Sequence, residues 1–75
     1  MTTKIIDRKT GKEVKEGTIL IRKDYKGFKH RYEVLGFDKM LRGDTGAKVR
    51  KMGQDDRWTY LFMPLNALQL DEVIL

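Results

Sequence analysis

Residues 46–63 read GAKVRKMGQDDRWTYLFM, and this stretch decides the fold. Apolar and polar residues alternate on both sides of Gly53–Asp56, a segment of Gly, Gln and Asp that favours a turn. Alternation with a period of two is typical of β-strands. The stretch therefore predicts a β-hairpin with strands at Gly46–Met52 and Arg57–Met63.

The second strand of this hairpin carries Trp58, Tyr60 and Phe62 at alternate positions, so these aromatic side chains share one face. The register of the hairpin decides what that face does, because a shift of one residue turns every side chain of a strand to the opposite face. With a four-residue turn, Val49 faces Tyr60 and Ala47 faces Phe62, and the aromatic side chains join the core. We favour this interpretation, since burying one aromatic side chain contributes about 2–3 kcal/mol and a short chain needs its largest apolar groups inside.

A turn that is longer by one residue gives the alternative. Arg50 then faces Trp58 and Lys48 faces Tyr60, which creates an exposed basic and aromatic surface suited to stacking bases against cations. The sequence alone leaves both registers open.

The rest of the chain predicts further short strands joined by turns, because glycines recur about every six to ten residues. The polar segment Asp38–Thr45 is expected to be a loop, and Leu65–Leu70, which follows Pro64, a single 3₁₀ or α turn. The other expected strands are Lys4–Asp7 and Lys12–Val14, which form an N-terminal hairpin, Thr18–Arg22 and Phe28–Phe37, which form a second hairpin around the turn Asp24–Gly27, and Gln69–Leu75, which closes the sheet.

This order of strands and turns resembles the SH3-like barrels. The residues that carry the resemblance are the strand opening Gly17-Thr18-Ile19-Leu20-Ile21, the loop Asp38–Thr45, the hairpin Gly46–Met63, and Pro64-Leu65-Asn66-Ala67-Leu68 where such barrels have a 3₁₀ turn. The resemblance implies an all-β fold, a small SH3-like barrel of five to six short antiparallel strands with one short 3₁₀ or α turn before the last strand. The chain lacks the aromatic and proline pattern of the eukaryotic SH3 ligand groove, so binding of proline-rich peptides is not implied.

We expect a single domain over residues 1–75, with the N-terminal hairpin at 1–16 and the barrel body at 17–75. A compact, charged chain of this kind also resembles the small proteins of phages and mobile elements.

Positive charge is concentrated in the first three quarters of the chain. The sequence holds 16 Lys and Arg residues against 11 Asp and Glu residues, a net charge of +5, and every basic residue precedes Trp58. The last segment, 58–75, carries only Asp71 and Glu72. Such an excess attracts phosphates or acidic protein surfaces over about one Debye length, without specifying a sequence. The composition therefore favours binding over catalysis.

The leading hypothesis is a non-enzymatic binding module whose basic face contacts nucleic acid mainly through phosphates. The stretch 22–31 surrounds a turn with basic residues and two aromatic side chains, so it can bind a phosphate backbone while a ring stacks on a base. The alternative for this stretch is a solvated hairpin whose charges protect a sheet edge from aggregation. The predicted nucleic-acid-binding residues are Lys23, Lys26, Lys29, Arg31, Lys48 and Arg50 for charge, with Tyr25 and Trp58 for stacking.

The apolar C-terminus supports a second hypothesis, a small phage-like protein-protein interaction module that docks on an acidic surface of a larger partner and modulates it. Together with Leu68, the side chains of Leu70, Val73, Ile74 and Leu75 exceed what one closing strand buries, so part of this stretch is available to a partner or to a second copy. A third hypothesis is an accessory domain whose basic face has no dedicated ligand.

Catalysis, metals and cofactors are not expected. The chain has no Cys, which excludes disulfides, thiolate nucleophiles and cysteine zinc sites. His30, the single histidine, is interpreted as ordinary surface, and Asp55-Asp56 as turn residues. No apolar run reaches the roughly 18–20 residues of a membrane span, and the N-terminus is too polar for a signal peptide. We therefore expect a cytoplasmic protein with no membrane partner, of open oligomeric state.

Overall fold

The computed structural model describes residues 3–52 and 57–75. This part of the chain forms six β-strands and one short 3₁₀ helix, η1, which confirms the all-β class and the short turn before the last strand. The elements are, in order, β1 (Thr3–Asp7), β2 (Ile19–Lys23), β3 (Lys29–Lys39), β4 (Thr45–Met52), β5 (Trp58–Pro64), η1 (Leu65–Leu68) and β6 (Leu70–Ile74).

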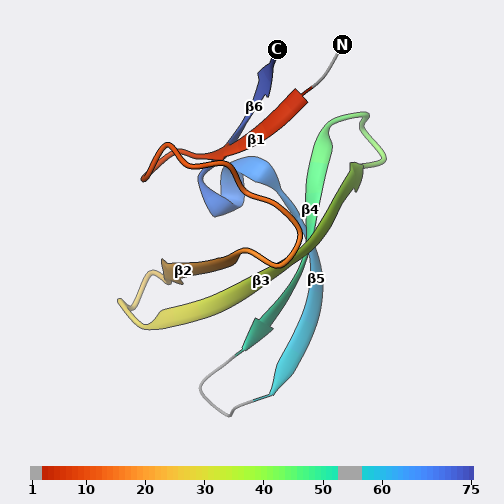
Figure 1. Ribbon diagram of the computed structural model, residues 1–75. Coiled ribbons are helices and arrows are strands. Elements are labelled where there is room, and N and C mark those ends of the chain that lie inside the picture. The colour runs from red at the N-terminus through yellow and green to blue at the C-terminus, as the bar shows by residue number, and fades with distance from the viewer. Residues whose placement is uncertain (1–2, 53–56) are drawn as a thin grey trace.

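The strands form two antiparallel sheets. Strands β2, β3, β4 and β5 follow one another in a four-stranded meander, which confirms the second hairpin and the hairpin expected over residues 46–63. Strand β6 pairs with β1 in a separate two-stranded sheet, whereas the sequence predicts that it closes the sheet. Figure 1 shows β1 and β6 at the end of the molecule where both termini lie, with η1 next to them and the meander curving away.

The chain turns back after β1 without forming a complete second strand. Gly11, with φ of 73°, lies in this turn, and the amide of Val14 donates a hydrogen bond of 2.7 Å to the carbonyl of Ile5. Ile6 and Glu13 form an isolated bridge. The expected strand Lys12–Val14 is therefore reduced to one bridge on the edge of β1 that does not pair with β6.

The expected loop Asp38–Thr45 is shorter than predicted, because Asp38, Lys39 and Thr45 belong to strands. β3 continues to Lys39, which pairs with Thr45 at the start of β4, so the connection is a turn of residues 40–44. Within it, the amide of Met40 donates to the carbonyl of Asp44 over 2.7 Å. The loop prediction is confirmed for residues 40–44 and too long at both ends, because the end of this hairpin is polar and polarity gives no sign of pairing.

β3 bends in the middle of its eleven residues. Its register with β4 shifts between Val34 and Gly36, which marks a β-bulge. A bulge inserts one extra residue and bends the strand. As a result Val34 and Phe37, three positions apart, both contact the core.

The core lies between the two sheets and η1. Leu68 of η1, Leu70 of β6, Val34 of β3 and Val49 of β4 are the largest fully buried side chains. Each contributes about 1.5–3 kcal/mol by leaving water, so the two sheets depend on a common core. Among the described residues, the buried apolar side chains are Ile5, Val14, Leu20, Tyr32, Val34, Ala47, Val49, Leu68 and Leu70.

One ion pair is buried beside this core. Arg22 Nη2 donates to Asp7 Oδ1 over 3.0 Å, and Arg22 Nε donates to the carbonyl of Leu68 over 3.0 Å, so one side chain joins β1, β2 and η1. Burial by itself would raise the pKa of Asp7, but hydrogen bonds from the Lys9 amide and from Arg22 outweigh it and lower that pKa below its ordinary value. Asp7 is therefore a carboxylate at neutral pH.

Candidate functional site

The register of the β4–β5 hairpin places the aromatic side chains outside the core. Met52 pairs with Trp58, Arg50 with Tyr60, and Lys48 with Phe62. Trp58, Tyr60 and Phe62 are 37%, 69% and 42% exposed. The favoured core interpretation is therefore wrong, and the alternative assigns the correct face.

The physical reason is the length of the connection. Residues 53–57 separate the paired residues Met52 and Trp58, one more than the predicted turn Gly53–Asp56, whose own residues lie outside the described part of the chain. One extra residue exchanges the two faces of β5. Leu61 and Met63 consequently take the inward positions opposite Val49 and Ala47, and Arg50 faces Tyr60 rather than Trp58.

Directly paired residues of an antiparallel sheet point to the same side, so the registers of the meander define one outward surface, which we call the outer face. The outer face consists of Ile19, Ile21 and Lys23 of β2, Lys29, Arg31 and Glu33 of β3, Lys48, Arg50 and Met52 of β4, and Trp58, Tyr60 and Phe62 of β5.

The structure brings most of the predicted nucleic-acid-binding residues together on the outer face. Lys23, Lys29, Arg31, Lys48, Arg50 and Trp58 all lie on it. Tyr25 and Lys26 lie instead in the β2–β3 turn at one end of this face, where the Tyr25 ring is 93% exposed and Lys26 Nζ is 5.6 Å from its centroid. Sequence reasoning missed the apolar part of the face, Ile19 and Ile21, which are 47% and 53% exposed.

Arg50 occupies the centre of the outer face. Its Nε and Nη2 atoms both donate to Glu33 Oε1, over 3.0 and 2.6 Å, and its Cζ lies 4.2 Å from the centroid of the Trp58 ring. The hydrogen bond with Glu33 raises the pKa of Arg50, so the guanidinium stays charged. Glu33 neutralises this charge, and the planar guanidinium supports one face of the indole by a cation–π contact.

Two of the five basic residues on the outer face are paired, and three are not. Arg50 pairs with Glu33, and Lys48 Nζ lies 3.3 Å from Asp38 Oδ2 in a pair that is more than half exposed on both sides. Among the described residues, Lys23, Lys29 and Arg31 form no ion pair. These three charges remain available for an anionic ligand.

Asp24 fixes the turn beside these cations. Its Oδ1 accepts hydrogen bonds from the amides of Lys26 (2.9 Å) and Phe28 (3.0 Å), and His30 Nε2 donates to its Oδ2 over 2.8 Å. The hydrogen bond from His30 lowers the pKa of Asp24. The interpretation of His30 as ordinary surface is wrong, since its side chain is only 13% exposed and holds this turn. An Asp at the first position of a Gly-containing turn is the sequence signal for this arrangement.

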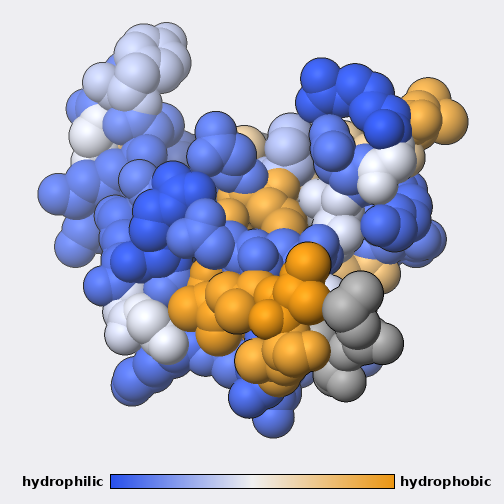
Figure 2. Space-filling view, turned by 90° about the horizontal axis from the view of Figure 1, so that it is seen from above, coloured by the Kyte–Doolittle hydropathy of each residue, from blue (hydrophilic) through white to orange (hydrophobic). Residues whose placement is uncertain are grey.

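The C-terminal residues divide into core and surface. Leu70 is 2% exposed and belongs to the core, which corrects its assignment as a partner-binding residue, because it points inward beside η1. Val73, Ile74 and Leu75 are 41%, 64% and 62% exposed. Figure 2, seen from the end where the termini lie, shows an apolar area on this part of the surface.

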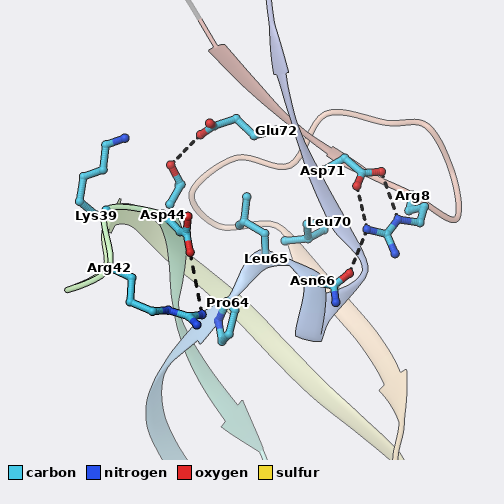
Figure 3. A pocket seen from close by; sticks show the side chains of 12 residues that line it. Arg8, Lys39, Arg42, Asp44, Pro64, Leu65, Asn66, Leu70, Asp71 and Glu72 are labelled. Atoms are coloured by element: carbon cyan, nitrogen blue, oxygen red, sulfur yellow. Dashed lines mark hydrogen bonds and ion pairs between the residues drawn. The ribbon is translucent and has the colours of Figure 1, made fainter.

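A separate cavity of about 450 Å³ lies between the β3–β4 hairpin and β6. Polar groups at its rim are engaged with one another. Figure 3 shows Arg8 beside Asp71, where Arg8 Nη2 donates to Asp71 Oδ1 over 2.8 Å. Thr45 Oγ1 donates to Glu72 Oε2 over 2.7 Å. Within residues 3–52 and 57–75, no cluster of His, Asp and Glu side chains is suited to hold a metal ion. The cavity therefore offers few free groups for chemistry.

Comparison with protein-family models, with curated proteins and with solved structures gave no match. The described residues contain no helix long and apolar enough to cross a membrane.

Proposed function

We propose that this protein is a non-enzymatic binding module whose outer face binds nucleic acid, with Lys23, Lys29 and Arg31 contacting phosphates. The observation that carries the proposal is the presence of exposed aromatic rings and unpaired cations on one face of one sheet. Cations supply affinity for the phosphate backbone, and rings supply surfaces on which bases stack.

The exposed aromatic side chains do not contribute their burial free energy to folding, which supports a role for them in binding a ligand. A chain of 75 residues has few large apolar side chains, and burying each one contributes about 1.5–3 kcal/mol. On the outer face, Trp58, Tyr60 and Phe62 stay exposed along β5, while Ile19 and Ile21 stay exposed on β2 at the opposite edge of the meander. A row of three exposed aromatic side chains on one strand is typical of a binding site.

The SH3-like barrel expected from the sequence is part of the proposal. The two sheets share one core, and the hydrogen bond from Thr45 to Glu72 joins the start of β4 to β6. In such a barrel the outer face is the convex side of the meander, which leaves it open to a ligand.

The test is a titration of the protein against a fluorescent random single strand and a random duplex at about 50 and 200 mM salt. Three phosphate contacts give a slope of log K against log salt of about −2 for a single strand, hence a loss of affinity of about 20-fold over this range. Lys29→Gln should flatten the slope by about 0.7, while Lys12→Gln, an exposed lysine of the N-terminal turn, should not change it. Affinity that does not respond to salt would refute the proposal.

A second candidate function is docking on another protein through the C-terminal residues. Val73, Ile74 and Leu75 are exposed, and among the strands of residues 3–52 and 57–75 β6 pairs with β1 alone. Deleting these three residues should leave a folded monomer and abolish capture of the partner if they form an interface. Loss of folding on deletion would instead assign them to the structure.

A further inference from the structure

Building on the proposed function, we infer that the outer face selects an unstacked single strand over a duplex. Successive bases lie on the rings of Trp58, Tyr60 and Phe62 along β5. The sugar–phosphate backbone lies on the side of β3, where Lys29 and Arg31 project.

The spacing of the rings along β5 is larger than the spacing of stacked bases. Alternate residues of an antiparallel strand lie about 6.8 Å apart, since each residue advances the strand by about 3.4 Å. Stacked bases of a duplex follow one another at about 3.4 Å along each strand. Two neighbouring bases can therefore occupy Trp58 and Tyr60 only if they no longer stack on each other.

Duplex DNA cannot use these rings in the same way. Its bases are stacked inside the helix and present only their edges in the grooves, so an exposed ring finds no base surface to cover. A duplex can still contact the cations of the outer face through its phosphates. The rings therefore add affinity for a single strand alone, and the cations add affinity for both.

The accessible surfaces of the rings fit this arrangement. One face of the Trp58 indole is covered by the Arg50 guanidinium at 4.2 Å, which leaves the opposite face for a base. A side chain at Gly46 would place its Cβ 2.6 Å from Phe62 Cε1, so the absence of a side chain there allows the Phe62 ring to lie close to the sheet. Tyr60, between them on β5, is the most exposed of the three, at 69%.

The unpaired cations lie to one side of the aromatic row. Arg31 pairs with Met52, which pairs with Trp58, so Arg31 and Trp58 are two strands or about 10 Å apart in the same row of the sheet. Lys29 and Lys23 form the next row toward the β2–β3 turn. This separation places phosphates over β3 and bases over β5, which favours one orientation of the strand across the sheet.

The experiment compares a fluorescein-labelled random DNA strand of about 12 nucleotides, within the usual site size for such surfaces, with the same strand annealed to its complement. Anisotropy at about 50 mM salt gives both affinities, and intrinsic fluorescence reports on the site directly because Trp58 is the single tryptophan. We expect the single strand to bind at least tenfold more tightly and to quench Trp58, whereas the duplex leaves this emission unchanged.

Three variants separate the contributions of rings and cations. Tyr60→Ala should weaken binding of the single strand by about 5- to 150-fold and of the duplex by less than about twofold, and Tyr60→Phe should restore the single-strand affinity. Leu41→Ala, a matched loss of a fully exposed apolar side chain at the other end of the sheet, should change neither affinity. Because Tyr60 is exposed, all three variants are expected to retain the wild-type circular dichroism spectrum and melting temperature.

The outcomes distinguish this inference from the proposed function. Equal affinity for single strand and duplex, unaffected by Tyr60→Ala, overturns the single-strand selectivity and leaves nucleic-acid binding intact. Absence of binding to both probes at about 50 mM salt overturns the proposed function itself. Displacement of the strand by polyglutamate at equal charge concentration overturns the inference as well, because it assigns the outer face to acidic proteins.

Discussion

Replacing Arg22 by Met should cost the protein a large part of its stability at neutral pH. The substitution keeps the length of the side chain but removes the partner of a buried carboxylate, since the side chains of Arg22 and Asp7 are 12% and 9% exposed. It also removes the hydrogen bond of 3.0 Å from Arg22 Nε to the carbonyl of Leu68. Breaking a buried ion pair on one side costs about 3–5 kcal/mol. The free energy of unfolding of a domain of 75 residues is about 4–11 kcal/mol in total, so the variant retains little stability.

The chain supplies a matched control in a second Arg–Asp pair. Arg8 Nη2 and Asp71 Oδ1 are 2.8 Å apart, but both side chains are about half exposed. Exposed pairs contribute about 0–1 kcal/mol, so Arg8→Met should change the free energy of unfolding by less than about 1 kcal/mol. Urea unfolding at pH 7, followed by far-ultraviolet circular dichroism, gives both values. A difference of less than about 1 kcal/mol between the Arg22 and Arg8 variants would refute the assignment of the buried pair.

The pH dependence gives an independent check with a defined sign. Asp7 has a lowered pKa in the folded protein, so it contributes stability that is present above its unfolded pKa of about 3.9 and is lost as the pH falls through the lowered folded value. In Arg22→Met, burial without the partner raises the pKa of Asp7. Asp7 is then protonated at a higher pH than in the wild type, and protonation removes the cost of the buried unpaired charge. The stability difference between wild type and variant should therefore shrink between pH 7 and pH 4. A difference that stays constant over this range would contradict the argument, and Asp7→Asn combined with Arg22→Met should recover most of the loss at pH 7.

Further expectations concern single side chains and are all measured by urea unfolding. Gln69→Gly should stabilise by about 0.5–1 kcal/mol, because φ of 58° is unfavourable for a residue with a Cβ atom; no gain would contradict this conformation. Leu70→Ala should cost about 2–5 kcal/mol, whereas Ile74→Ala on the same strand should stay within about 0.5 kcal/mol; equal losses would contradict the assignment of Leu70 alone to the core. Gly46→Ala should cost about 1 kcal/mol, because its Cβ displaces the half-exposed Phe62 ring, and an unchanged stability would show that the ring is mobile.

The strands of the meander could be predicted from the sequence, but the register of its last hairpin could not. Alternation placed Trp58, Tyr60 and Phe62 on a common face without indicating which face, since this depends on whether Arg57 belongs to the turn or to the strand. A local pattern of period two is the same in both registers. The argument that a small domain buries its aromatic side chains fails here, because Leu61 and Met63 already take the inward positions.

The sequence predicted the basic residues of the outer face, because the alternation of side chains along a strand is a local property. It did not predict the acidic side chains with which arginines pair. Lys29 and Arg31 lie two positions apart on one strand, so they share a face wherever that strand goes. The pairing of Arg50 with Glu33 and of Arg22 with Asp7 joins residues 17 and 15 positions apart. These contacts depend on how β3 pairs with β4 and on how β1 approaches β2, which composition does not encode.

The pairing of β1 with β6 has a consequence for the order in which the chain folds. Each hairpin of the meander joins neighbouring segments, whereas Thr3 pairs with Ile74 across nearly the whole length of the chain. Contacts between distant segments form late, because the entropy of closing a long loop must be overcome before they contribute. During synthesis on a ribosome, β1 with Ile5 therefore remains unpaired with β6 until the end of the chain has been made. The meander is the part of the protein that can fold first.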